Sequence, residues 1–306
     1  MVPFCIAGVQ MNVSLAGNNI EAMEKRIVSI VNRFPWVQMI VFSELATFGP
    51  SPEHAQPMPG PAEAHFCEIA SRYGLWLLPG SMFESYGELL YNTASVINPY
   101  GHVVGRYRKM FPFRPYELGV ESGTEFLVFD VPEVGRFGVS ICYDMWFPET
   151  TRTLVSMGAE VILHPTMTDT IDRDVELPIA RAMAAINQCY FFDINGTGEC
   201  GNGHSIVVGP SGYVIHQAGS GEEVIPVEIN LSRVRRDREV GIRSLGQPLK
   251  SFRDNPVDFS VYRKNEFDHS YLNSLGPLSK LQRPQVVALA TPADAAELPA
   301  IMPIKH

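Results

Sequence analysis

Short, mostly apolar runs alternate along this chain with segments in which apolar residues recur every three or four positions. Segment 18–34 has helical spacing, and the run at 37–42 that follows is almost entirely apolar. Such runs are typical of strands in a sheet that is covered on both faces. Residues 61–73 predict a second helix, which ends at Gly74. The alternation therefore predicts an α/β fold.

The same pattern continues to about residue 230. Further strands are expected at 4–13, 75–78, 91–98, 103–107, 126–131, 136–141, 160–163 and 190–194, and further helices at 148–157 and 172–188. Three later runs, 204–208, 213–217 and 224–229, predict a meander because turn residues separate them. The chain has 306 residues, of which 45% are hydrophobic, so it is long enough for one large core. We expect one domain over residues 1–264.

Residues 265–306 differ from the rest because they are rich in Pro, Ala and Leu and have no clear period. The prolines exclude one long helix, and the apolar side chains would be costly to leave in water. We therefore expect a C-terminal arm that packs on a neighbouring subunit of a homo-oligomer.

Charge and cysteine usage exclude several classes of protein. The net charge is −9 and the basic residues are scattered, which argues against a nucleic-acid partner. No run approaches the ~20 apolar residues of a membrane helix, so no membrane association is expected. The five cysteines have no CxxC spacing, so we expect a cytoplasmic protein with no disulfide framework, metal site or other cofactor.

Cys142 stands where a strand is expected to turn into a helix. An apolar strand leads to Ser140-Ile-Cys142-Tyr-Asp-Met-Trp-Phe-Pro-Glu149, and a helix begins near Pro148. A thiol at such an elbow is held rigidly near helical amide donors, as a nucleophile requires. The alternative is a buried structural cysteine.

Two charged residues also lie at the ends of expected strands. Val41-Phe-Ser-Glu44 ends one strand with an acid, and Arg106-Tyr-Arg-Lys109 ends another with a lysine. The ends of sheet strands are where α/β proteins place their sites. Taken singly, each residue has another explanation: Glu44 as a cap of the segment that follows it, and Lys109 as a solvated charge at the rim of the sheet.

Together these three segments resemble the motifs of the nitrilase superfamily, whose catalytic set is Glu, Lys and Cys. Phe-Ser-Glu44, Arg-Lys109-Met-Phe-Pro and Ile-Cys142-Tyr-Asp match in order and context, and the resemblance extends from residue 4 to about 254. It implies a four-layer α-β-β-α sandwich, and an oligomer built from dimers.

The chain further resembles the aliphatic amidase and formamidase branch. Lys109-Met-Phe-Pro-Phe-Arg-Pro-Tyr-Glu117 fits the pattern in which a second glutamate follows the lysine by eight residues. Two features differ from that branch. The branch usually has Cys-Asp-Asp where this chain has Cys142-Tyr143-Asp144, and the N-terminal extension typical of aliphatic amidases is missing. An exposed loop acid remains the alternative for Glu117. These two differences leave the identity of the substrate open, but they do not change the expected reaction.

The resemblance implies that a small linear amide is cleaved to an acid and ammonia through a thioester on Cys142. Glu44 would move the proton, and Lys109 with the backbone N–H of Tyr143 would stabilise the oxyanion. Glu117 would orient the substrate nitrogen or the groups around Lys109. The enzyme would then be an amide hydrolase acting on carbon–nitrogen bonds other than peptide bonds.

The acyl group is expected to contact residues near the cysteine and at the next strand end, namely Tyr143, Trp146, Thr166 and Met167. A core position is the alternative for each. Hydrolysis of carbamoyl amides or nitriles is a second hypothesis, and Arg114 is a possible anion-binding group for carbamoyl amino acids. The residues after Cys142 argue against a true nitrilase. A non-catalytic scaffold is a third hypothesis, against which the retained polar residues argue.

Overall fold

The computed structural model of this chain describes residues 3–15, 17–263 and 267–280. It separates into a first unit, residues 1–267, and a second unit that begins at Asp268 and contains α7 (Ser270–Ser274). The expected domain boundary after residue 264 and the expected packing of the arm stay predictions, because residues 281–306 lie outside the described residues.

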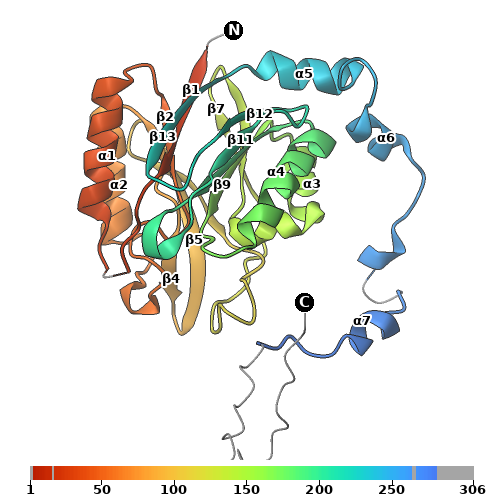
Figure 1. The fold of residues 1–306 in the computed structure, drawn as a ribbon, viewed down its shortest axis with the longest axis horizontal. Coiled ribbons are helices and arrows are strands. Elements are labelled where there is room, and N and C mark those ends of the chain that lie inside the picture. Colours follow the sequence, from red (N-terminus) through yellow and green to blue (C-terminus); the bar gives the residue numbers. More distant parts are fainter. Residues whose placement is uncertain (1–2, 16, 264–266, 281–306) are drawn as a thin grey trace, which may run out of the picture. The chain divides into compact units, whose positions relative to one another are not determined.

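Two mixed sheets form the centre of the first unit (Figure 1). The first sheet has the order β13-β1-β2-β3-β5-β4, with β6 also paired to β5. Its strands are β1 (Phe4–Gln10), β2 (Met39–Phe42), β3 (Trp76–Leu78), β4 (Met82–Tyr86), β5 (Leu89–Ile97), β6 (Val103–Arg108) and β13 (Glu223–Ile229). The strands β1, β2 and β3 are parallel to one another, and antiparallel strands flank them.

The second sheet repeats this plan with the order β12-β11-β10-β9-β8-β7. Its strands are β7 (Leu127–Val131), β8 (Gly135–Val139), β9 (Val161–Thr166), β10 (Tyr190–Asn195), β11 (Ile206–Val208) and β12 (Val214–Gln217). Here β8, β9 and β10 are the parallel strands. Their carboxyl ends share one edge of the sheet, where the candidate site lies.

Helices cover the outer face of each sheet (Figure 1). The pair α1 (Ile20–Arg33) and α2 (Pro61–Tyr73) packs on the first sheet, and α3 (Pro148–Ser156) and α4 (Arg173–Asn187) pack on the second. The expected α-β-β-α sandwich is therefore confirmed. After β13 the chain forms α5 (Leu231–Val240) and α6 (Pro248–Asp254), and short 3₁₀ turns lie at η1 (Pro52–His54), η2 (Cys142–Trp146), η3 (Gly198–Cys200) and η4 (Ser260–Tyr262).

Strand β2 shows why its sequence is apolar at every position. Met39 and Val41 pack between the two sheets, whereas Ile40 and Phe42 face the layer of α1 and α2. Successive strand residues point to opposite faces, so a strand covered on both faces needs an unbroken apolar run.

The expected meander near the end of the domain is wrong. Strands β11 and β12 form a hairpin in the second sheet, but β13 crosses to the first sheet and pairs antiparallel with β1, from Phe4 opposite Ile229 to Gln10 opposite Glu223. An alternating pattern shows that one strand face is buried, but it does not specify the sheet that the strand joins.

No helix within the described ranges is long and apolar enough to cross a bilayer.

Candidate active site

The turn after β8 places Cys142 in an unusual backbone conformation. Ile141 is extended, but Cys142 has φ 45° and opens the 3₁₀ turn η2, after which α3 begins at Pro148. A non-glycine residue in the left-handed region costs ~1–3 kcal/mol and persists where its surroundings fix it. The expected elbow is present, and its strain marks Cys142 among the residues of this turn.

Asp144 is the residue that braces the elbow. Its Oδ2 accepts hydrogen bonds from the Ile141 N–H (2.8 Å) and the Tyr107 hydroxyl (2.7 Å), and its Oδ1 accepts from the Phe111 N–H (2.9 Å). Burial raises the pKa of Asp144 to about 6, although these three donors oppose the rise. The turn at Cys142 is thereby tied to β6 and to the loop that follows it.

A buried cluster of Lys109, Glu44 and Glu117, here called the lysine cluster, adjoins the thiol. The Lys109 Nζ lies 2.8 Å from Glu44 Oε1 and 2.7 Å from Glu117 Oε2. The side chains of Lys109 and Glu44 are 1% and 2% exposed, and that of Glu117 is 17% exposed. Lys109 is therefore not a solvated rim charge, and Glu117 is not an exposed loop acid.

Asn92 on β5 joins the two carboxylates of the lysine cluster and was not among the predicted site residues. Its side-chain Nδ2 donates to Glu44 Oε1 (2.8 Å) and to Glu117 Oε1 (3.4 Å), and its backbone carbonyl accepts from the backbone N–H of Lys109 (2.8 Å). The sequence gives no distinct signal for this role, because segment 91–98 also contains Thr93, Ser95 and a second amide, Asn98.

The electrostatics of the site keep the thiol neutral and the lysine charged. Burial, and then the charge of Glu44, raise the pKa of Cys142 well above its ordinary value, and Lys109 opposes the rise. Burial would lower the pKa of Lys109, but Glu44, Cys142 and Glu117 outweigh it and raise that pKa. Burial also raises the pKa of Glu44, whose carboxylate has Cys142 as a hydrogen-bond partner. Attack by the sulfur therefore requires a base, and Glu44 is placed to act as one.

A cavity of about 310 Å³ opens beside Cys142. Tyr143, Trp146 and Met167 line it, so the structure brings together three of the four residues predicted to contact the acyl group, and the contact itself stays a prediction. Thr166 does not line it: this side chain is buried, and its hydroxyl donates to Asp193 Oδ1 (2.7 Å). Thr166 is the last residue of β9 and its hydroxyl is directed to Asp193 on β10, whereas Met167 follows the strand and lines the cavity.

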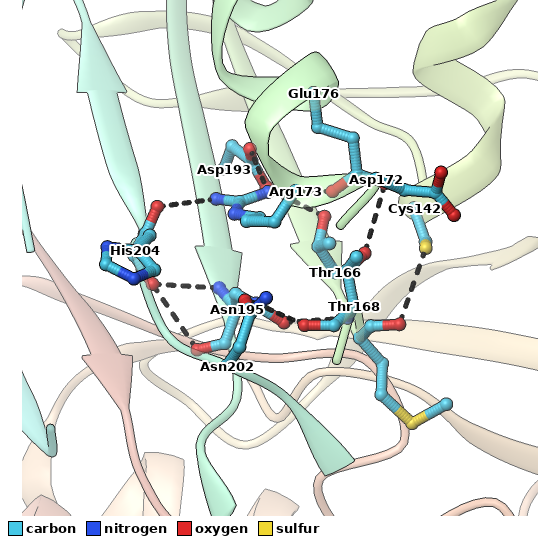
Figure 2. Close-up of polar contacts among 12 residues, drawn as sticks. Cys142, Thr166, Thr168, Asp172, Arg173, Glu176, Asp193, Asn195, Asn202 and His204 are labelled. Atoms are coloured by element: carbon cyan, nitrogen blue, oxygen red, sulfur yellow. Dashed lines mark hydrogen bonds and ion pairs between the residues drawn. The ribbon is translucent and has the colours of Figure 1, made fainter. Parts of the chain in front are cut away.

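A second buried cluster, Arg173 with Glu176 and Asp193, holds the wall behind the cavity (Figure 2). We call it the arginine cluster. The Arg173 guanidinium lies 3.1 Å from Glu176 and 2.8 Å from Asp193. Asp193 in turn accepts from Thr166, and Glu176 accepts from the Thr168 hydroxyl (3.0 Å). No feature of the sequence assigned a role to these three charged residues.

The Met167 carbonyl accepts from the Cys142 thiol at 4.0 Å (Figure 2). The carbonyl is held in place because the next residue, Thr168, donates its N–H to Asn195 Oδ1 (2.9 Å). The arginine cluster thus fixes the segment that faces the sulfur.

The five cysteines are free. Within residues 3–15, 17–263 and 267–280, no group of three or more His, Cys, Asp or Glu side chains is placed to hold a metal ion.

Comparison with known families identifies the class of protein. Residues 5–239 match the model of the carbon-nitrogen hydrolase family, so the chain belongs to that family. It is an amidase-type hydrolase of the nitrilase superfamily, which acts on carbon–nitrogen bonds other than peptide bonds.

Its relatives include amidases, in broad agreement with the predicted branch. The chain is 32% identical to omega-amidase NIT2-A of Xenopus laevis over 61% of this chain and 73% of the relative. It is 33% identical to a protein named nitrilase from Pyrococcus abyssi, over 76% and 92% of the two chains. The solved structure of Saccharomyces cerevisiae Nit3 has a TM-score of 0.70 and 26% identity, with 78% and 93% covered.

Proposed function

We propose that this protein hydrolyses a small linear amide to a carboxylic acid and ammonia through a thioester on Cys142. The observation that carries the proposal is the lysine cluster, in which a buried ammonium lies between Glu44 and Glu117 beside the neutral thiol. This arrangement supplies a base, a fixed positive charge and a nucleophile to one cavity.

In the first half-reaction, Cys142 Sγ attacks the amide carbon while Glu44 takes the thiol proton. The charge that develops on the carbonyl oxygen is stabilised by the Lys109 ammonium and by the backbone N–H of Tyr143. Glu44 then gives its proton to the nitrogen, the C–N bond breaks, and ammonia leaves.

In the second half-reaction, water attacks the thioester and Glu44 accepts its proton. The C–S bond breaks, the acid leaves, and the proton returns from Glu44 to the sulfur. Lys109 stays protonated throughout because the neighbouring carboxylates raise its pKa. Glu117 holds the ammonium in position, since its carboxylate accepts a hydrogen bond from it.

The charge around the cavity favours an amide over a carbamoyl amino acid. Arg114, the possible anion-binding group, is exposed, and its guanidinium donates to the Val120 carbonyl (2.9 Å). The described residues that line the cavity include neither Arg nor Lys. Lys109, the cation beside the thiol, is already paired with Glu44 and Glu117, so a substrate carboxylate would find no unpaired cation among these residues.

The test measures ammonia release from short amides, carbamoyl amino acids and nitriles. We expect turnover of amides by the parent protein, and a loss of ~10⁶-fold in Cys142→Ala with the fold retained. Cys67→Ala is the matched control because Cys67 is a partly exposed thiol outside the cavity, and it should keep full activity. Residual activity of Cys142→Ala above about a thousandth of the parent would exclude a nucleophilic role.

Limited alkylation provides an independent check. Iodoacetamide is itself a short amide, so we expect it to modify Cys142 before the more exposed Cys67. Peptide mass spectrometry reads out the order. Preferential modification of Cys67 would mean that Cys142 is an inert buried thiol.

A further inference from the structure

One wall of the Cys142 cavity is built from aromatic rings. Phe113 and Tyr116 come from the loop after β6, and Tyr143 and Trp146 come from the turn η2. Neighbouring rings contact one another. Phe113 stacks on Tyr116 and meets Tyr143 edge-on, with ring centroids 4.9 Å apart in each pair, and the ring centroids of Tyr143 and Trp146 are 5.9 Å apart. The result is a continuous apolar surface next to the nucleophile.

The facing wall is acidic. Residues 167–176 contribute Met167 together with the carboxylates of Asp169, Asp172 and Glu176. Asp172 and Glu176 line the same cavity as Cys142, and all three are labelled in Figure 2. An apolar surface opposite a row of carboxylates suits a ligand with an apolar body and no negative charge.

The buried charges at and behind this wall do not cancel, because Glu176 lines the cavity whereas Arg173 and Asp193 do not. Arg173 is shared between Glu176 and Asp193, so the arginine cluster contains one more carboxylate than cations. The amino-terminal end of α4 adds a partial positive charge of only ~0.5. With Asp169 and Asp172 at the cavity as well, the carboxylates of this wall outnumber its cations, and this excess opposes an incoming carboxylate.

The size of the cavity indicates how large the acyl group is. At about 310 Å³ it lies at the lower end of the range for small-molecule sites, ~300–1,000 Å³. A one- or two-carbon acyl group on Cys142 would leave most of the aromatic wall without contacts. A ring on a short linker would reach it and gain edge or face contacts with those side chains.

We infer that the pocket takes the acyl group of an uncharged amide that carries a ring on a short linker, and that it rejects acyl groups ending in a carboxylate. This inference rests on the proposed amidase function and adds the substrate class to it. The aromatic wall formed by Phe113, Tyr116, Tyr143 and Trp146 provides the preference for a ring, and the acidic wall provides the exclusion of anions.

Three amides test the inference with the full-length protein. These are 3-phenylpropanamide, butyramide and 3-(4-carboxyphenyl)propanamide, each assayed for ammonia release. We expect kcat/KM for the phenyl compound to exceed that for butyramide by about tenfold or more, and the carboxylate to cost at least about tenfold. Equal or faster hydrolysis of butyramide, or full acceptance of the carboxylate, would overturn the inference and leave the amidase proposal standing. Failure to hydrolyse any amide would overturn both.

Paired variants assign the two effects to the two walls. Tyr116→Ala should lower the preference for the phenyl compound over butyramide by about threefold or more, whereas Tyr100→Ala, which removes an exposed tyrosine elsewhere, should not change it. Asp172→Asn should improve hydrolysis of the carboxyphenyl compound relative to the phenyl compound. Asp174→Asn is the control, because Asp174 is exposed on the same helix and does not line the cavity. Equal ratios in a variant and its control would overturn the assignment of that wall.

Discussion

The lysine cluster and the arginine cluster contain the same charges in different settings. Each has one buried cation between two carboxylates, and the side chains of Lys109 and Arg173 are both 1% exposed. The lysine cluster lies beside the Cys142 thiol, and its Glu117 retains some solvent contact. In the arginine cluster Glu176 reaches the cavity, whereas Arg173 and Asp193 lie behind its wall, and hydroxyls of Thr166 and Thr168 complete the hydrogen bonds.

The choice of cation matches the setting. A lysine ammonium is a compact charge whose hydrogen bonds can be redirected, which suits stabilisation of an oxyanion that forms and disappears. The Arg173 guanidinium is a rigid fork that also donates to the His204 carbonyl (2.8 Å), so it joins α4, β10 and the segment before β11. We infer that the first cluster serves the reaction and that the second holds the protein around it.

The largest effect should come from breaking the lysine cluster. Glu44→Gln and Lys109→Met are each expected to lower kcat/KM by ~10³-fold or more, because they remove the base or the oxyanion charge. Their effects should not add, since the two residues act in the same step. Steady-state ammonia release from the two single variants and the double variant measures this. A double variant that loses the product of the two factors would show independent roles.

Breaking the arginine cluster should instead lower stability. Arg173→Met would leave Glu176 and Asp193 buried without their cation, which we expect to lower the free energy of unfolding by ~3–5 kcal/mol. Urea unfolding measures the loss. Arg26→Met is the control, because the Arg26–Glu222 pair is half-exposed and should contribute at most ~1 kcal/mol.

Activity of the Arg173→Met variant completes the comparison. Folded Arg173→Met protein should keep turnover within about tenfold of the parent, since Arg173 does not line the cavity. Unchanged stability together with lost turnover would reverse the roles that we give to the two clusters.

Sequence reasoning located the residues of the lysine cluster but not those that support them. Glu44, Lys109 and Cys142 stand at strand ends, and each lies in a short motif that can be recognised from its own local sequence. Asn92 and Arg173 acquire their roles from partners far along the chain, such as Glu44, which is 48 positions from Asn92. Such contacts exist only once the strands pair, so no local pattern reports them.

The errors of the sequence analysis have the same physical origin. Thr166 was expected to line the cavity because it ends the strand after the cysteine, but its hydroxyl bonds to Asp193 on the neighbouring strand β10, and Met167, just after the strand, lines the cavity instead. Strand β13 was assigned to a meander because its turn residues resemble those of a hairpin, but it completes the other sheet. Local propensity was sufficient to identify the strands, but long-range packing determines which sheet each strand joins.

The smallest expected effect is a change in the pH dependence of Cys142 alkylation, which should differ between variants of the two clusters. Burial raises the pKa of Glu44 above 4.5, so as the pH falls Glu44 takes up a proton and is lost as a base. The rate of Cys142 alkylation should therefore fall on the acid side, with a midpoint above 4.5. Lys109 opposes this rise in the pKa of Glu44, so Lys109→Met should move the midpoint to higher pH. Arg173→Met should move the midpoint less, because the charges that dominate the shift in the pKa of Glu44 are those of Lys109 and Glu117. Equal shifts in both variants, measured by mass spectrometry of the alkylated peptide between pH 4 and pH 8, would mean that both clusters act electrostatically on the nucleophile.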